Sequence, residues 1–382
     1  MRVGILSSFY PQIQGGAETS LVFLLEGLRA LGLDPIILTM SKPQPDLSSH
    51  IIPLGHFTDL PKRIKLLGLP GLNSMLANRL TKLLRENRID LLHVNDTYSL
   101  RGAVKAVQRS KIPLVLSYHN NLNIPYSSYG IPYPVNSLLD VREKGILKAA
   151  KKSSIVMATS NYIAGRLIAS GLRPALVRMI YIGGAISGWG TSPAEFGDRP
   201  IRLLSVGVIQ YHKGIQDLLI AVKKLEELNV PFELVIAGNG PYVKKLQSLT
   251  IGLGLTNRAK FAGRVDNEEL MRLYDWCDIV IVPTLTPEPF GRVAVEAMSR
   301  GRPVVGTNNG GLAEIIENDK TGYLVPPGNP TAIAERLVQV RSNPALLAEM
   351  GRRALDRCKT VFDQELIAKQ VLEVYNYTSS NS

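Results

Sequence analysis

The 382-residue sequence predicts an α/β protein with two Rossmann-like domains that face each other across a cleft. Three observations favour this fold class. The chain is longer than a single hydrophobic core usually allows. Short runs of Val, Ile and Leu alternate with helical stretches, as buried parallel strands do in βα units. The alternation occurs on both sides of a Gly-, Ser- and Pro-rich segment at residues 183–200, so we predict domains at 1–185 and 186–361.

The first domain begins with an apolar run, RVGILS, then a Gly-rich turn and a helical pattern from Thr19 to Leu31. Its remaining strands are predicted at the apolar runs PIILTM, DLLHVND, IPLVLSYH and SSIVMATS.

The second domain repeats the scheme. Strands are predicted at IRLLSVG, FELVIAG, DIVIVPT and PVVGTN, with helices near 214–228 and 241–253. The segment AKFAGRV leads to a further helix around Glu268–Tyr274. From about residue 331 the chain is helical, with a stop near Asn343–Pro344 and an amphipathic last segment at 362–377.

Basic residues are concentrated in the first half. The chain carries 44 Lys and Arg against 32 Asp and Glu, a formal net charge of +12. Residues 1–185 hold 22 basic and 10 acidic residues, so 22 − 10 = +12 and the second half is neutral. Lys and Arg often cover solvated faces, but so one-sided an imbalance favours a half that meets an anionic partner, such as a phosphate-bearing substrate or a membrane surface.

Two cysteines, Cys277 and Cys358, cannot form a disulfide framework, and they indicate a reducing cytosolic setting. The N-terminal residues do not read as a signal peptide. No apolar run reaches the roughly 20 residues that span a bilayer. We therefore expect a cytoplasmic protein that is either soluble or peripheral on the inner face of the cell membrane.

Ligands of such sheets bind at the carboxyl ends of the strands, so the loops there are the candidate sites. Gly16 follows the first strand and opens a helix, whose free N–H groups suit an anion; a plain tight turn explains it equally well. The full G-x-G-x-x-G fingerprint is absent, which gives a nicotinamide enzyme only weak support. His119 ends the strand IPLVLSYH, where a structural and a functional His are equally expected.

In the second domain, Lys213 lies at the mouth of a strand-end loop, where it can neutralise a phosphate. A surface Lys is the alternative, although the helix dipole disfavours a cation at that position. Gly238, in the loop IAGNGP, belongs to another strand-end turn and is a weaker candidate.

The segment TPEPFGRVAVEAMSRG, residues 286–301, places one carboxylate in a turn and another in a helix. Pro289 and Gly291 exclude a continuous helix through Glu288, so the helix is predicted to begin near Gly291. The N–H groups of Gly291, Arg292 and Val293 would then be free to bind an anion. Glu296, inside the helix, can accept hydrogen bonds from ribose hydroxyls; a solvent-facing helix residue is the alternative.

Several chemistries lack their motifs in this sequence. It contains no D-x-D, no Walker loop, no G-x-S-x-G and no Cys/His cluster, so no metal-ligand set or cofactor is expected. The basic half has no aromatic-interleaved patch, which makes nucleic acid a poor candidate partner.

Taken jointly, the strand-end loops resemble a known family. The sequence is similar over nearly its whole length to retaining glycosyltransferases of the GT-B fold, in the group-1 or family-four class. The resemblance rests on GGAE and His119 in the first half and, in the second, on VGVIQYHKG, IAGNGP, FAGRV, PEPFGRVAVEAMSRGRPVV, GGLAEII and TGYLVPPGN.

The resemblance implies a role for each half of the Glu-x7-Glu motif. Glu288 would lie beside the donor sugar, and Glu296 would bind the ribose of the nucleotide. Lys213 would balance the charge of the leaving nucleotide. His119 would contact the donor sugar near its reacting carbon, and Gly16 would bring its N–H group to the diphosphate.

Further contacts follow from the same resemblance. The backbone around Phe290–Val293 would contact sugar and diphosphate, while Arg264 and Val265 would line the base. The first domain would bind the acceptor, and the C-terminal helix, about 362–382, would pack back onto that domain. A nucleotide-sugar donor and a glycan or lipid-linked acceptor are thus the expected partners, with UDP-sugars first and GDP-mannose second.

One position departs from the family pattern. Val208 stands where an Arg usually helps to hold the diphosphate, so one cation is missing. Loss of such a partner could cost about 2–4 kcal/mol of transition-state stabilisation. Arg292 is the nearest candidate to replace it, and a weakened or inactive enzyme is the other interpretation.

The acceptor side leaves alternatives open. Residues 61–87 mix Leu with Lys and Arg at helical spacing, which fits a helix packed on its sheet or an interfacial helix that binds anionic lipid. Two rival functions share the fold: a nucleotide-sugar epimerase, and a non-catalytic nucleotide-sugar-binding partner, the latter suggested by Val208. An epimerase would turn over without an acceptor.

Overall fold

The computed structural model describes residues 1–10, 16–41, 50–55, 70–122, 135–183, 188–190 and 197–381. It divides into two compact units. The first takes in Met1–Asn123, Ser137–Gly183 and Gln364–Ser382, and the second takes in Ile124–Asn136 and Gly184–Asp363. The division predicted at residues 185/186 lies close to Gly183 and Gly184, within a predicted linker that is largely outside the described residues.

The first unit contains a parallel sheet, in the part of the chain that the structure describes, with the order β3-β2-β1-β4-β5-β6-β7. Its strands are β1 (Val3–Ser7), β2 (Ile36–Thr39), β3 (Ile51–Pro53), β4 (Leu91–Val94), β5 (Leu114–Tyr118), β6 (Ile155–Ala158) and β7 (Val177–Met179). Its helices are α1 (Gly16–Ala30), α3 (Pro70–Glu86), α4 (Leu100–Ser110), α5 (Val135–Ala150), α6 (Asn161–Ala169) and α14 (Gln364–Ser380).

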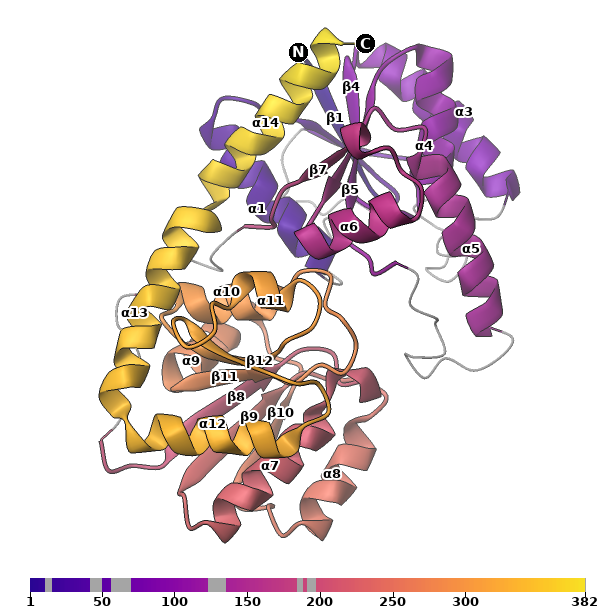
Figure 1. The fold of residues 1–382 in the computed structure, drawn as a ribbon. Helices are drawn as coiled ribbons and strands as arrows, with labels where there is room; N and C mark the ends of the chain where they lie inside the picture. Colours follow the sequence, from indigo (N-terminus) through magenta and orange to yellow (C-terminus); the bar gives the residue numbers. More distant parts are fainter. Residues whose placement is uncertain are drawn as a thin grey trace. The chain divides into compact units, whose positions relative to one another are not determined.

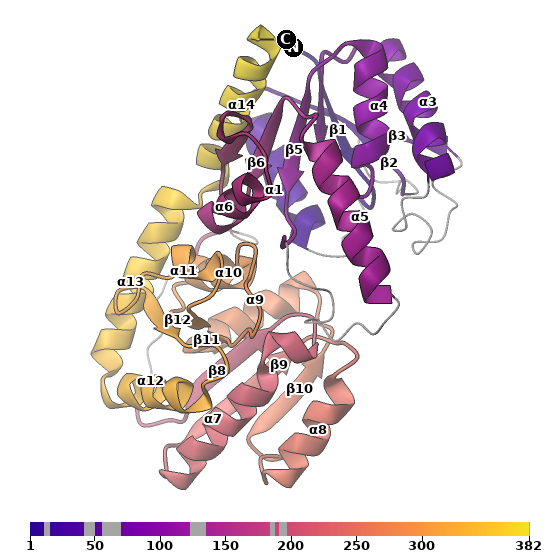
Figure 2. The same ribbon diagram turned by 45° about the vertical axis from the view of Figure 1, so that its right-hand side comes forward.

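Helices cover both faces of this sheet, which explains why its strands are continuous apolar runs. On one face α14 lies along α1, as Figures 1 and 2 both show, and their apolar side chains share a core with β1 and β4. On the other face, α3, α4 and α6 contribute to a second core. The predicted packing of the C-terminal helix on the first domain is therefore present as the contact of α14 with α1.

The second unit has a parallel sheet with the order β10-β9-β8-β11-β12-β13 among its described residues. Its strands are β8 (Ile201–Val206), β9 (Phe232–Ala237), β10 (Ala259–Gly263), β11 (Ile279–Val282), β12 (Val304–Thr307) and β13 (Gly322–Val325). Its helices are α7 (Ile215–Glu227), α8 (Val243–Gly252), α9 (Asn267–Trp276), α10 (Arg292–Ser299), α11 (Leu312–Ile315), α12 (Pro330–Ser342) and α13 (Pro344–Val361).

The predicted strands are confirmed in both sheets, whereas β3, β7, β10 and β13 are additional. All four lie at sheet edges. β3, β7 and β13 have only three or four residues, too short to show a period, and β10 lies in the segment AKFAGRV, which was predicted only to lead into a helix. The predicted helix stop near Asn343–Pro344 is also confirmed. Asn343 ends α12, and its side chain accepts a hydrogen bond from the Leu346 amide to cap α13.

Within the predicted amphipathic stretch 61–87, residues 61–69 lie outside the described part of the chain, and α3 forms the remainder. Its apolar side chains Leu76, Leu80, Leu83 and Leu84 are buried in the core beneath it. The interpretation as a helix packed on its own domain is therefore correct for α3. Its polar face remains basic.

Candidate functional site

In the second unit, two strand-end loops are fixed to each other by their backbones. The turn that follows β8 contains a short 3-10 helix, Tyr211–Lys213, and the loop after β11 begins at Pro283. The Leu285 amide donates a 2.8 Å hydrogen bond to the His212 carbonyl. Gly214 has φ +70° and lies so close to the Pro283 carbonyl that a Cβ would be 1.8 Å from its oxygen. Only glycine fits this approach, which sets the position of Lys213.

Lys213 and Glu288 meet as a result. The Lys213 ammonium donates a 2.5 Å hydrogen bond to Oε1 of Glu288, and both side chains remain partly exposed. The two residues come from loops after β8 and β11, strands that pair in the sheet. Two charges that the sequence predicted from separate motifs therefore form one ion pair at the carboxyl edge of the sheet.

The Gly310–Gly311 turn after β12 supports Glu288 from the other side. The Gly311 amide donates a 2.7 Å hydrogen bond to the Glu288 carbonyl, and residues 288 and 310 form an isolated parallel bridge. A Cβ at Gly310 would lie 2.4 Å from the Glu288 carbonyl oxygen. This glycine pair therefore allows the loop that carries Glu288 to pack against the end of β12.

Helix α10 begins where the sequence predicted, at Arg292 with Gly291 as its N-cap. Gly291 has φ +113°, and the side chain of Leu312 leaves no room for a Cβ there. The preceding Phe290 is buried against Phe362, with ring centroids 5.9 Å apart. The amides of Arg292 and Val293 thus lie in a first helical turn, where N–H groups have no partner within the helix.

Glu296 is buried in α10 with 2% of its surface exposed, so the alternative that it faces solvent is wrong. Its Oε2 accepts a 2.8 Å hydrogen bond from the Tyr274 hydroxyl. Burial, and then Glu296 itself, raise the pKa of Tyr274, which keeps that hydroxyl a donor. Arg292 Nη1 lies 3.1 Å from Oε1 of Glu296. The predicted ribose ligand and the predicted substitute cation are therefore ion-paired with each other.

The other predicted residues of this unit lie at neighbouring strand ends. Gly238, with φ +143°, packs on Gly207, whose carbonyl oxygen would be 1.9 Å from a Cβ. Its structural role is therefore the close packing of β8 and β9. Arg264 is exposed and Val265 half-buried directly after β10. Val208 is 55% exposed after β8.

His212 had no role in the sequence prediction, yet it lies beside the ion pair. Burial and then the charge of Lys213 lower its pKa to about 4, against an opposite effect of Glu288. It is therefore neutral near pH 7. The charges of both Lys213 and Glu288 change the pKa of the His212 ring, and the effect of Glu288 could be found only from the tertiary structure.

In the first unit, His119 follows β5 and Gly16 is the first residue of α1. Asn95, which follows β4, connects these two regions. Its Oδ1 lies 3.3 Å from Nε2 of His119, and its Nδ2 donates a 3.1 Å hydrogen bond to the Ala17 carbonyl. Asn95 was not predicted from the sequence; its position at the end of the strand in DLLHVND was the available signal.

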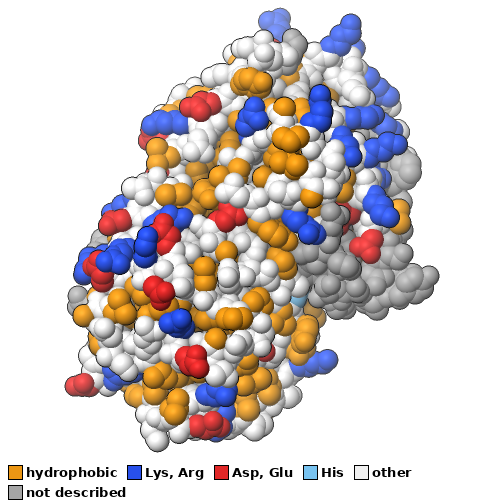
Figure 3. Space-filling model, viewed as in Figure 1, with side chains coloured by type: hydrophobic (Ala, Val, Ile, Leu, Met, Phe, Trp, Pro, Cys, Tyr) orange, Lys and Arg blue, Asp and Glu red, His pale blue; other side chains and the backbone are white. Residues whose placement is uncertain are grey.

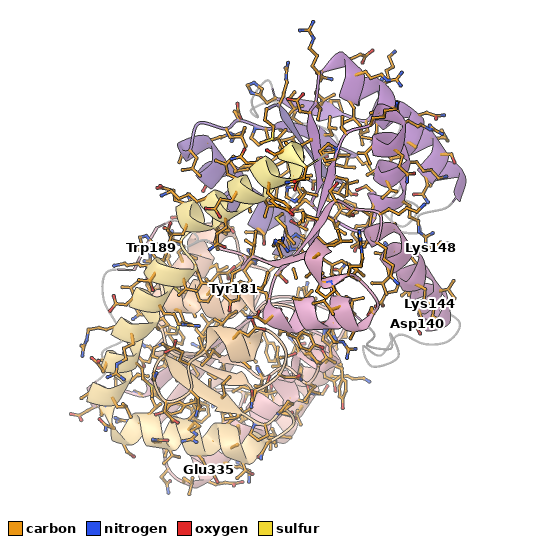
Figure 4. The ribbon with its side chains drawn as sticks, turned by 45° about the horizontal axis from the view of Figure 1, so that its top comes forward. Asp140, Lys144, Lys148, Tyr181, Trp189 and Glu335 are labelled. Carbon is orange, nitrogen blue, oxygen red and sulfur yellow. The ribbon has the colours of Figure 1, made fainter. Side chains whose placement is uncertain are left out.

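His119 also lines a pocket of the first unit that encloses about 490 Å³, including space open to solvent. Apolar walls come from α1, β6, α14 and residues 180–183, and polar groups come from Asn95, Ser117, His119 and Thr159. Tyr181, labelled in Figure 4, belongs to the segment that closes one side. Such a pocket, apolar with a few converging polar groups, is typical of a small-molecule site.

Among the described residues, no three His, Cys, Asp or Glu side chains are grouped so that they could hold a metal ion. No described helix is both long and apolar enough to cross a membrane.

Models of two protein families match the chain, one in each half. The model for Glycosyltransferase Family 4 matches residues 14–183, and that for Glycosyl transferases group 1 matches residues 192–357. Among curated proteins, the phosphatidyl-myo-inositol mannosyltransferase of Mycobacterium leprae is 23% identical, covering 100% of this chain and 98% of that protein. The glycogen synthase of Mycobacterium tuberculosis is 27% identical over 76% of this chain and 69% of its own.

Solved structures match the full length. The sucrose-phosphate synthase of Thermosynechococcus elongatus has a TM-score of 0.84 at 23% identity, with 100% of both chains covered. The Anabaena protein HepE, solved in complex with UDP-glucose, has a TM-score of 0.78 at 24% identity and covers 99% of this chain and 100% of its own. These likenesses confirm the predicted GT-B fold.

Proposed function

Because the chain belongs to the group 1 and family 4 glycosyltransferases, we propose that it transfers a hexosyl group from a nucleotide-diphosphate sugar to a hydroxyl group of a glycan or a lipid-linked acceptor. The observation that carries this proposal is the Lys213–Glu288 ion pair at the carboxyl edge of the second sheet, where Glu288 belongs to the loop that leads into helix α10. A cation beside a helix start is suited to a diphosphate, and a carboxylate next to it is suited to a sugar.

Cleavage of the anomeric C–O bond leaves negative charge on the nucleotide diphosphate. In the proposed reaction Lys213 and the first-turn amides of α10 stabilise that charge, because they are fixed before the reaction begins. Glu296, buried and held by Tyr274, is oriented to accept from the ribose hydroxyls. Phe290, fixed by its contact with Phe362, sets the position of the helix start.

We further propose that the reaction retains the anomeric configuration. Retaining glycosidases use a carboxylate nucleophile, and among the described residues Glu288 is the carboxylate that we place beside the sugar. Its hydrogen bond from Lys213 lowers its availability for covalent attack. Front-face substitution, in which the departing phosphate takes the proton of the acceptor hydroxyl, agrees better with this pairing. The product's anomeric configuration, read by NMR coupling constants, tests retention.

Metal independence is part of the same proposal, since Lys213 and helix amides supply the positive charge that a divalent cation would otherwise provide. Unchanged turnover after treatment with EDTA supports this assignment. Loss of turnover that Mg²⁺ or Mn²⁺ restores would contradict it.

A thermal-shift screen over nucleotide sugars tests the donor class, because a ligand that binds only the folded state raises the melting temperature. UDP-sugars are the first choice, in keeping with the complex of HepE with UDP-glucose, and GDP-mannose is the second. The chosen donor is then incubated with candidate acceptors and with none. Turnover to an isomer of the donor without an acceptor would instead indicate an epimerase.

A non-catalytic nucleotide-sugar-binding partner is the second alternative, and exposed Val208 in place of a cation motivates it. Such a protein would bind the donor in the same screen, yet neither transfer nor hydrolyse the sugar.

For the acceptor we propose entry at the first unit, whose surface over α3, α4 and α5 is strongly basic, as Figure 3 shows. Exposed basic side chains on or next to these helices are Lys82, Arg85, Arg88, Lys105, Arg109, Lys111, Lys144 and Lys148. Lys144 and Lys148 are labelled on α5 in Figure 4. This charge suits an anionic lipid surface that carries the acceptor. Sedimentation with anionic vesicles that weakens as salt rises supports this proposal, and no sedimentation at low salt would contradict it.

A further inference from the structure

Asn95 lies between His119 and the start of α1 at Gly16, the two places in the first unit where the family resemblance implies contact with the donor. Its side chain is 2% exposed at the end of β4. One end of the amide contacts the His119 ring, and the other contacts the carbonyl of Ala17, the residue after Gly16. A single buried amide thus connects the ring of His119 with the first turn of α1.

The orientation of this amide follows from chemistry. The Ala17 carbonyl can only accept a hydrogen bond, so it must face the NH₂ group of Asn95. The Asn95 oxygen is thereby directed at His119, 3.3 Å from Nε2. An oxygen requires a donor, so Nε2 must carry the proton of the neutral imidazole. The reverse orientation would set two oxygens against each other at Ala17.

His119 is neutral near pH 7, because burial lowers its pKa to about 4. With its single proton on Nε2, the other nitrogen, Nδ1, has a free lone pair. Nδ1 is buried and has no hydrogen-bond partner among the described residues. An unpaired buried acceptor is costly, so this nitrogen is suited to receive a donor group from a ligand.

No described side chain supplies that donor, since Nδ1 of His119 has no hydrogen-bond partner among the described residues. Both ring nitrogens of His93, on β4, are hydrogen-bonded. Nδ1 lies 2.7 Å from the Tyr375 hydroxyl of α14, and Nε2 lies 2.8 Å from the Ser117 hydroxyl. Burial, and then the effect of His119, lower the pKa of His93 to about 3, so it too is neutral. Tyr181 lines the adjacent pocket.

We propose that Asn95 is a positioning residue that holds His119 in the Nε2–H tautomer, so that Nδ1 accepts a hydrogen bond from a substrate hydroxyl group. The inference rests on the proposed function for the part that His119 plays in turnover. It also assigns a direction to the contact: His119 receives a proton-bearing group and cannot itself donate to the sugar. The bond from Asn95 to Ala17 couples that ring to the start of α1.

The nitrogen chemical shifts of the His119 ring test the tautomer without any turnover. They are measured by NMR on the ¹⁵N-labelled full chain at pH 7, with the signal assigned by its loss in His119→Gln. Protonated Nε2 and bare Nδ1 are the expected result. A proton on Nδ1 would overturn the proposal, whether or not the protein transfers sugar.

Asn95→Asp then tests the link, because it places a carboxylate next to Nε2. It also replaces the Nδ2 donor to the Ala17 carbonyl with an oxygen, so the measurement is the pKa of His119 and not stability. A carboxylate favours the imidazolium, so the pKa of His119 should rise by at least one unit in the same NMR titration. The imidazolium has no lone pair on Nδ1. With a pKa of about 5, only about a tenth of the variant's His119 is neutral at pH 4, against about half in the wild type, so transfer by the variant should fall about fivefold more than that of wild type between pH 7 and pH 4. Asn78 is exposed on α3, so Asn78→Asp makes the same change away from the ring and serves as the matched control.

The outcomes separate this inference from the proposed function. An unchanged His119 titration in Asn95→Asp would overturn the inference while wild-type transfer stands. A raised pKa without the acid-side loss of transfer would overturn the role of the Nδ1 lone pair. If the wild type transfers no sugar at all, the proposed function fails, and the NMR measurements still decide whether Asn95 fixes the tautomer.

Discussion

The Lys213 ammonium lies 2.5 Å from the Glu288 carboxylate, although 75 residues separate them in the chain. Both positions belong to one charge-stabilising unit in the proposed reaction. Glu288→Gln and Lys213→Met should each lower kcat about 10²- to 10³-fold, and the double variant should lose little more than either single one. Transfer assays under saturating donor measure this.

The control for that pair is Lys223→Met, which breaks the Lys223–Glu226 bridge on α7. A partly exposed bridge of that kind contributes little, so kcat should remain near wild type. Near-normal activity of Glu288→Gln would contradict the role assigned to this carboxylate.

Tyr274 holds the buried Glu296, so removing its hydroxyl should weaken donor binding more than it slows the chemical step. Tyr274→Phe is expected to raise the donor KM about tenfold and to destabilise the protein by about 1.5–3 kcal/mol, the worth of a hydrogen bond to a charged group. Tyr323→Phe is the matched control, because the buried Tyr323 hydroxyl has no partner among the described residues. Equal effects of the two substitutions on KM would argue against a ribose contact at Glu296.

Val208 and Arg292 provide a test by rescue. If Arg292 replaces the missing cation, Arg292→Ala should reduce transfer, and Val208→Arg should restore much of the loss in the double variant. Val208 is 55% exposed, so the longer side chain can be accommodated there. Val208→Gln adds length without charge and should not rescue. Unchanged transfer in Arg292→Ala, with transfer abolished in Lys213→Ala, would refute the hypothesis that Arg292 replaces the missing cation.

Gly214 should tolerate no side chain. Its positive φ and the approach of the Pro283 carbonyl predict that Gly214→Ala destabilises the second unit by more than about 1–2 kcal/mol and disturbs Lys213. Gly252, in α8, has open space around it, and Gly252→Ala should instead be neutral or stabilising by about 0.5–1 kcal/mol. Urea unfolding measures both, and similar midpoints for the two variants would contradict the prediction.

His93 should make the protein less stable in acid. Burial lowers its pKa from 6.5 to about 3, so between these values the unfolded chain binds a proton that the folded chain does not. Stability therefore falls as pH drops below 6.5, by about 2 kcal/mol from pH 7 to pH 5 for this residue alone. The loss should be shallower in His93→Gln, measured by urea unfolding at both pH values. If the free energy of unfolding of His93→Gln falls with pH as steeply as that of wild type, His93 is not a source of the acid sensitivity.

The fold was predictable because its signals are local. Strands buried on two faces are apolar runs. Gly291 marks the start of α10 by its own backbone preference, whatever packs around the helix. The site was predictable only as separate loops. Nothing in the sequence around Tyr274 indicates that its hydroxyl meets Glu296, 22 residues later, because that contact depends on how α9 packs beside α10.

Asn95 shows the same limit. An Asn at a strand end has many possible partners, and only the pairing of β4 with β5 and the packing of α1 bring His119 and Ala17 to its two ends. The short edge strands β3, β7 and β13 escaped prediction for the opposite reason, since three or four residues carry too little pattern of their own.

The contact of α14 with α1 has a consequence for biosynthesis. Leu21, Leu25 and Leu28 of α1 share their core with Ile367, Val371 and Tyr375 of α14, residues translated more than 330 positions later. Domains usually fold in the order in which they leave the ribosome. Here the first unit, begun earliest, must keep one apolar face uncovered until the last helix emerges, while every strand of the second unit has already been made.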